Sequence, residues 1–102
     1  MYIIEYLLDA KKDLDDIVYY LSNKLNKKEY ALKFIELYEI EEKNILQFPF
    51  SYPVFNICSD IGFIYRLAKI EDYLVFFSIN STDKIITIVR VLYSKRNIDE
   101  LL

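Results

Sequence analysis

Hydrophobic and polar positions follow two different periods along this chain. Residues 2–8, YIIEYLL, are dominated by β-branched and aromatic side chains and predict a strand. Asp9 follows and is expected to cap a helix. Apolar residues then recur at spacings of three and four, as Leu14, Ile17, Val18, Leu21 and Leu25. This pattern predicts an amphipathic helix over about residues 10–25.

A second helical stripe begins after a polar break at Asn26. Asn26 and Glu29 have the spacing of a capping box, with Asn in place of Ser. The apolar positions of this stripe are Ala31, Phe34, Ile35, Tyr38, Ile45 and Leu46. Because Pro49 disfavours helical geometry at the residue before it, the helix is expected to end near Gln47. The two helices together predict an antiparallel hairpin.

The second half of the chain has the pattern of a sheet. Segment 48–60 contains two prolines and no period, and predicts an extended crossing with, at most, a short edge strand. Runs rich in Ile, Val, Phe and Tyr then predict an antiparallel meander over residues 62–70, 73–80 and 84–93. Residues 95–102 predict a closing turn of helix. The expected fold is a single α+β domain over residues 1–102, with the hairpin laid on one face of the sheet in two layers.

The amino-acid composition excludes several kinds of catalytic and binding site. The chain is 54% hydrophobic and has a formal net charge of −3, so it has no general attraction to nucleic acid. It contains no histidine, which excludes Ser-His and Cys-His nucleophilic sites. Its single glycine excludes a glycine-rich phosphate loop, and its single cysteine, Cys58, excludes an internal disulfide and a thiolate zinc site. We expect no cofactor, no metal and, without a leader or membrane span, a cytoplasmic location.

The carboxylates of the first helix are interpreted as a solvated face. Asp13, Asp15 and Asp16 lie among lysines, which is the usual pattern of an exposed helix surface. A functional acid pair is the second hypothesis.

All three arginines, Arg66, Arg90 and Arg96, lie in the second half of the chain. Strict alternation along IVRVLY would place Ile88, Arg90 and Leu92 on one face of the last strand. Two hypotheses describe the role of Arg90. In the first, its charged end reaches solvent or pairs with a carboxylate at the rim of the sheet. In the second, it converges with Arg66 and Arg96 on an open face to hold an anionic group.

The order of elements, the run DYLVFFSIN, and Arg90-Val91-Leu92-Tyr93-Ser94-Lys95-Arg96-Asn97 with its leucine-ended tail resemble the RelE/ParE superfamily of toxins from bacterial type II toxin-antitoxin modules. The resemblance covers nearly the whole chain. It implies the RelE-like fold and a growth-inhibiting toxin that an antitoxin, encoded beside it, neutralises. Ser94 and Asn97 depart from the glycine and aspartate that are usual in the family.

The resemblance leaves the target open. ParE-like members inhibit DNA gyrase, and RelE-like members cut mRNA on the ribosome; we favour gyrase slightly, with an inactive member that only binds antitoxin as a third hypothesis. Arg96 matches a cationic position of the nucleases, whereas Leu74 stands where RelE has a catalytic arginine and Leu102 at or near its functional tyrosine. The available proton carriers for cleavage would be Tyr93, Tyr65, Asp99 and Glu100.

The candidate site therefore consists of two overlapping sets of residues. The candidate catalytic residues are Arg66, Arg90, Tyr93 and Arg96, and the candidate target-binding residues are Arg66, Arg90, Lys95 and Arg96. We expect an antitoxin partner that covers apolar surface at a sheet edge or beside the helices, with no membrane and no sequence-specific DNA bound by this chain alone.

Overall fold

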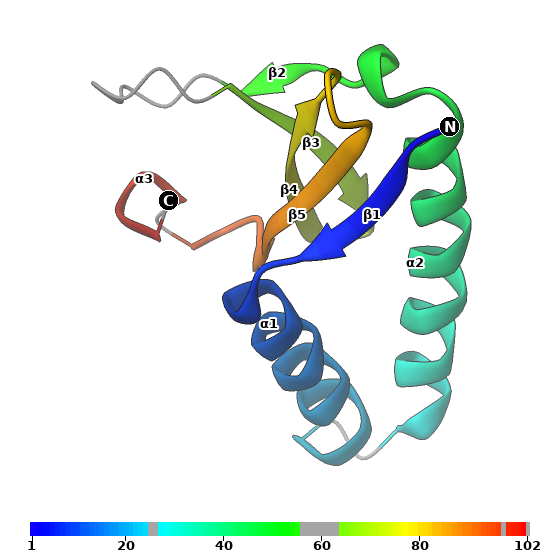
Figure 1. The fold of residues 1–102 in the computed structure, drawn as a ribbon. Helices are drawn as coiled ribbons and strands as arrows, with labels where there is room; N and C mark the ends of the chain where they lie inside the picture. The colour runs from blue at the N-terminus through cyan, green and yellow to red at the C-terminus, as the bar shows by residue number, and fades with distance from the viewer. Residues whose placement is uncertain (25–26, 56–63, 97, 102) are drawn as a thin grey trace.

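The computed structural model describes residues 1–24, 27–55, 64–96 and 98–101, and Figure 1 shows their arrangement. In chain order the elements are β1 (Ile3–Tyr6), α1 (Leu8–Tyr19), a π-helical turn η1 (Tyr20–Lys24), α2 (Lys28–Gln47), a 3₁₀ turn η2 (Pro49–Ser51), β2 (Val54–Phe55), β3 (Tyr65–Ile70), β4 (Tyr73–Asn80), β5 (Ile85–Tyr93) and α3 (Ile98–Leu101). The predicted α+β order of strand, helical hairpin, meander and terminal helix is confirmed.

The five strands form one sheet in the order β1-β5-β4-β3-β2. Strands β3, β4 and β5 form the predicted antiparallel meander, and the two-residue β2 is the expected short strand at one edge. β1 lies at the other edge and runs parallel to β5, with Tyr6 opposite Ile88. The first and last strands of the sequence are therefore neighbours, and β5 lies inside the sheet between β1 and β4.

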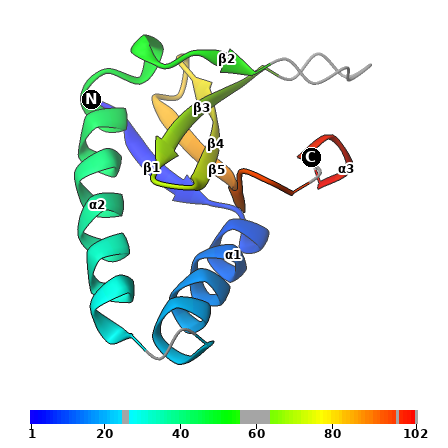
Figure 2. The ribbon, with the colours of Figure 1, turned by 180° about the vertical axis from the view of Figure 1, so that it is seen from behind.

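Helices α1 and α2 pack against one face of this sheet. In Figures 1 and 2 the two helices diverge like the arms of a V, and the sheet lies at the open end. One core joins buried side chains of both helices to the central strands: Ala10, Ile17, Phe34, Ile45, Ala68, Ile70, Val75, Phe77, Ile86, Ile88 and Val91. None of the described helices is long and apolar enough to span a membrane.

A β-bulge interrupts the alternation of β5. Phe77 of β4 pairs with Ile88, but Phe76 pairs with Arg90, so Val89 is the extra residue. Phe76 and Phe77 point to opposite faces because they are consecutive in a strand, and cross-strand partners share a face. The prediction that Ile88 and Arg90 share a face is therefore wrong, because one inserted residue turns Arg90 to the face away from the helices.

The first helix begins two residues earlier than predicted, and beyond Tyr19 it continues as the π-helical turn η1 to Lys24, close to the predicted end. It begins at Leu8, and its N-cap Leu7 makes no side-chain hydrogen bond, so the predicted cap at Asp9 is wrong. The physical reason is that the Leu7 N–H donates to the Ile88 carbonyl at 3.0 Å, so the chain passes from the β1 ladder directly into the helix. Asp9 lies instead in the first helical turn, where the positive end of the helix dipole favours a carboxylate.

The second helix ends at Gln47 as predicted, and it begins at Lys28 with Lys27 as its N-cap. Lys27 makes no side-chain capping bond, while Asn26, the cap that the sequence predicts, lies outside the described residues. The 3₁₀ turn at Pro49 was not predicted. Gly62 and Cys58 also lie outside the described residues.

Two tyrosines and a glutamate join the edge strand β1 to α2. The Tyr38 hydroxyl donates to the Tyr6 hydroxyl at 3.0 Å, and the Tyr6 hydroxyl donates to Oε2 of Glu42. Burial raises the pKa of Tyr38 to about 12. The pKa of Tyr6 is also raised, first by burial and then by its hydrogen bond to Glu42.

These pKa shifts predict that the protein loses stability at alkaline pH. Both phenols hold their protons more tightly in the folded state than in the unfolded chain, where the pKa is about 10. Their stabilisation is therefore complete below about pH 10 and declines as the pH rises toward about 12. Urea unfolding at about pH 8 and about pH 11 should show the lower free energy at the higher pH. The Tyr38→Phe variant should show a smaller decline, and an equal decline in both proteins would contradict the assignment.

Candidate functional site

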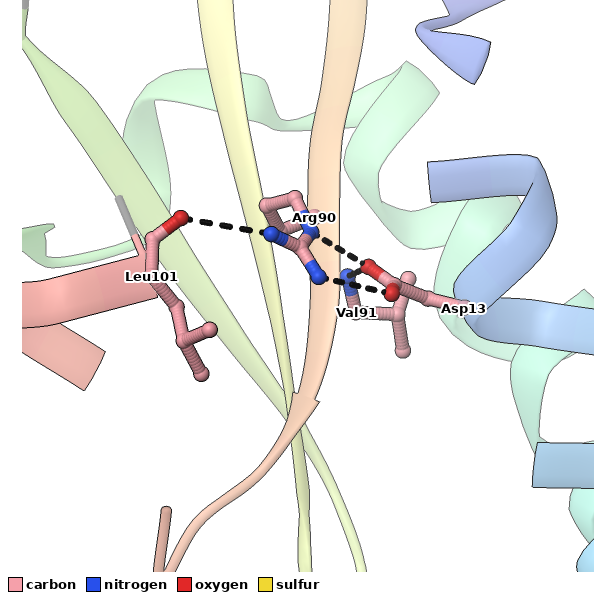
Figure 3. A network of polar contacts seen from close by, with 4 residues as sticks. All are labelled: Asp13, Arg90, Val91 and Leu101. Carbon is pink, nitrogen blue, oxygen red and sulfur yellow. Dashed lines mark hydrogen bonds and ion pairs between the residues drawn. The ribbon is translucent and has the colours of Figure 1, made fainter. Parts of the chain in front are cut away.

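Arg90 is held in a polar network rather than free to bind a ligand (Figure 3). Its Nε donates to Asp13 Oδ2 at 2.7 Å, and its Nη2 donates to Oδ1 at 2.9 Å. The Nη1 group donates to the carbonyl oxygen of Leu101 in α3 at 3.2 Å. The Arg90 and Asp13 side chains are only 18% and 10% exposed. Of the two hypotheses for Arg90, the structure contains the ion pair.

Asp13 also completes the hydrogen bonding of β5. β1 ends at Tyr6, opposite Ile88, and the Val91 N–H lies beyond that point and donates to Asp13 Oδ2 at 3.0 Å. The carboxylate thus takes the place of a missing strand partner, and Arg90 balances its buried charge. The hydrogen bond to Asp13 is the main reason that the pKa of Arg90 is raised.

The interpretation of Asp13 as part of a solvated face is therefore wrong, although Asp15 and Asp16 are exposed as predicted. A signal for its burial was present in the sequence. Asp13 stands three residues after Ala10 and four before Ile17, and both of these are buried. An acid on the apolar stripe of a helix requires a partner, and that partner is 77 positions away in the chain.

Arg66 lies on the opposite face of the sheet from Arg90. It pairs with Phe77 in the register of β3 and β4, whereas Arg90 pairs with Phe76. The Arg66 Nη1 group donates to the backbone carbonyls of Phe50 at 3.3 Å and Tyr52 at 2.7 Å. Its guanidinium also stands over the Phe50 ring, 5.2 Å from the centroid. The predicted convergence of Arg66 and Arg90 on one open face is wrong because the register separates them.

The remaining predicted site residues lie at and beyond the end of β5. Tyr93 is 38% exposed, and its ring packs edge to face on Tyr73 at 5.8 Å between centroids. Lys95 and Arg96 are exposed in the turn that follows. The side chains of Asp99 and Glu100 lie outside the described part of the chain.

Tyr93 and Arg96 border a groove of about 660 Å³ between the helical hairpin and the end of the sheet. We call it the tyrosine groove, because its lining includes Tyr20, Tyr30, Tyr73 and Tyr93. The apolar part of the lining is formed by Ile17, Leu21 and Val91, and the charged part by Asp13, Asp16, Lys33, Glu71, Asp72 and Arg96. Its volume lies in the range of small-molecule and peptide pockets. Sequence reasoning missed this groove because four separate segments of the chain form it.

The surroundings of the tyrosine groove are negative. Burial raises the pKa of Tyr73, and the neighbouring Tyr20, Tyr93, Asp72 and Glu71 raise it further. A phenol in this environment is a poor proton acceptor near neutral pH. Within residues 1–24, 27–55, 64–96 and 98–101, no group of three or more His, Cys, Asp or Glu residues could hold a metal ion.

This order of elements is also found in solved structures of toxin-antitoxin systems. A chromosomal ParDE system from P. aeruginosa has a chain that is 22% identical with a TM-score of 0.70, over 93% of this chain and 98% of that one. A chain of the RelBE2 complex from Mycobacterium tuberculosis is 13% identical with a TM-score of 0.59, over 90% and 96%. A chain of the RelE-RelB complex from Pyrococcus horikoshii is 21% identical with a TM-score of 0.54, over 93% and 97%. At these identities the likeness establishes the fold of this class of toxin.

The family follows from the sequence profile. The profile of the ParE toxin of type II toxin-antitoxin systems, parDE, matches residues 4–98. The chain therefore belongs to the ParE toxin family. Among curated proteins, no sequence matches the chain.

Proposed function

We propose that this member of the ParE toxin family inhibits growth by binding a protein target, DNA gyrase, without cutting RNA. The observation that carries this proposal is that the side chains of Arg66 and Arg90 are already bound within the chain. Both guanidinium groups are engaged in contacts within the chain, and they lie on opposite faces of the sheet. Of the four residues proposed to bind the target, Arg96 and its neighbour Lys95 are the exposed ones, and two adjacent cations on an acidic chain are a weak site for RNA.

A ribosome-dependent mRNA nuclease is the second candidate function. The likeness to chains of two RelE-type complexes favours it. RNA cleavage, however, needs a group that accepts the proton of the attacking 2′-hydroxyl. The chain has no histidine, and the pKa of Tyr73 in the groove is raised away from neutrality. These features favour inhibition by binding.

We further propose that an antitoxin binds this chain, as in the RelBE2 toxin-antitoxin complex and the RelE-RelB complex. Large apolar side chains on the described surface support this proposal. Ile3 in the edge strand β1 and Leu8 at the start of α1 are 57% and 81% exposed, and Phe48 and Phe50 after α2 are 64% and 55% exposed. A partner that buried them would gain hydrophobic free energy.

Two activity assays on the purified chain test the proposed target. We expect inhibition of plasmid supercoiling by gyrase, and no new 5′ ends when mRNA is translated in its presence. Arg96→Ala should weaken the inhibition if the exposed cation contacts gyrase, whereas Lys69→Ala, an exposed lysine on β3, is the matched control.

Cleavage of mRNA on the ribosome would contradict the proposal and favour the nuclease. If neither activity is found and the chain still binds its antitoxin, the third hypothesis, an inactive member that only binds antitoxin, takes its place.

A further inference from the structure

The tyrosine groove combines aromatic faces with carboxylates. Phe34 packs edge to face on Tyr73 at 5.3 Å, and Tyr73 on Tyr93 at 5.8 Å, so the two tyrosine rings are held in place from the core outward. Asp72 is fixed beside them, because its carbonyl oxygen accepts the Ser94 N–H at 2.8 Å. Tyrosine faces next to carboxylates attract cations, by the ring quadrupole and by charge.

Three of the four carboxylates that line the groove are available to a ligand. Asp13 is neutralised by Arg90, which is the one ion pair found in the described part of the chain. Asp16, Glu71 and Asp72 are exposed around the groove, and Lys33 and Arg96 are the cations of the same lining. Apart from Asp13, the groove lining therefore carries three carboxylates and two cationic side chains. The whole chain has a net charge of −3. This charge favours a cationic ligand over a phosphate.

Two unusual pieces of backbone border the same groove. The π-helical turn η1 (Tyr20–Lys24) presents Tyr20 and Leu21 to it, and such turns are rare and frequent at functional sites. Glu71, in the two-residue turn between β3 and β4, has a φ of 51°, in the left-handed region that favours glycine. The residue at this position is a glutamate, and its side chain adds a carboxylate to the lining of the groove.

We propose that the tyrosine groove receives a segment of the antitoxin in which a lysine or arginine stands between apolar residues. The cation lies over the tyrosine faces and against Asp16 and Asp72, and the flanking apolar side chains pack on Leu21 and on the rings of Tyr20 and Tyr30, which are 48% and 47% exposed. This inference rests on the proposed antitoxin partner and extends it, because it assigns a basic character to the segment that an acidic toxin binds.

Binding of the antitoxin encoded beside this chain, measured by calorimetry, tests the proposal. The Asp16→Asn/Asp72→Asn double variant should bind about tenfold more weakly or worse, because it removes two charges from the groove. Added salt should weaken wild-type binding more than it weakens binding of this variant. The control variant Asp15→Asn/Glu36→Gln removes two exposed charges outside the groove and should bind as the wild type does. Thermal melting of each variant checks that the fold is retained.

The other outcomes overturn the proposal. Equal loss of affinity in the groove and control variants would mean that net charge, and not the groove, attracts the antitoxin. Unchanged antitoxin affinity with loss of gyrase inhibition would assign the groove to the target, and unchanged affinity with unchanged inhibition would leave the groove without this role. Antitoxin binding is measured without gyrase, so this inference and the proposed gyrase target can fail separately.

Discussion

Replacing Asp13 with alanine is expected to lower the free energy of unfolding by about 3–5 kcal/mol. The substitution leaves the Arg90 guanidinium largely buried without its counter-charge, and it leaves the Val91 N–H without an acceptor. Both losses occur where β5 extends beyond the end of β1, so no neighbouring strand can replace the carboxylate. Urea unfolding followed by far-ultraviolet circular dichroism measures the loss.

Two comparisons separate the buried pair from a general effect of charge. Asp15→Ala, on the exposed side of the same helix, should change the free energy of unfolding by about 0.5 kcal/mol or less. Arg90→Met should cost less in the Asp13→Ala background than in the wild type, by about 0.5–3 kcal/mol of coupling. Equal costs in the two backgrounds would show that the two side chains do not depend on each other.

Replacing Phe34 with alanine is expected to cost about 3–5 kcal/mol. Phe34 is 1% exposed, and its ring contacts Tyr38 at 6.2 Å and Tyr73 at 5.3 Å between centroids. It therefore fills the space between α2 and the sheet, and its removal leaves a cavity that rigid neighbouring elements cannot close. The same urea titration measures the effect.

Leu32 provides the matched control for Phe34. It lies two residues earlier on the same helix and is 67% exposed, so Leu32→Ala should change stability by about 0.5 kcal/mol or less. Because Phe34 supports Tyr73, the Phe34→Ala variant should also bind antitoxin more weakly if the tyrosine groove is the docking site. Similar stability losses in the two variants would contradict the assignment of Phe34 to the core.

The candidate site was only partly predictable. Tyr93 and Arg96 do border a groove, and their place at the end of the last strand follows from its length in the sequence. The predicted cluster of Arg66 and Arg90 does not exist, because each guanidinium is bound within the chain on its own face. Asp13 was missed, because its role depends on where β1 ends relative to β5.

The sequence by itself determined which segments are helices and strands, and in what order. Helical and strand periods are local, so Gln47 was recognised as the end of α2, and the three strands of the meander were found close to their observed bounds. The closing motif from Arg90 to Asn97 also identified the superfamily before any contact was known.

Only the tertiary structure decided which residues meet. The bulge at Val89 reverses the face of every residue that follows it in β5, and such a register change arises from pairing with β4 rather than from the local pattern. The parallel contact of β1 with β5, the burial of Asp13 and the tyrosine groove likewise join segments far apart in the chain. Local periodicity determines the elements because it acts within a few residues, whereas the site depends on long-range packing.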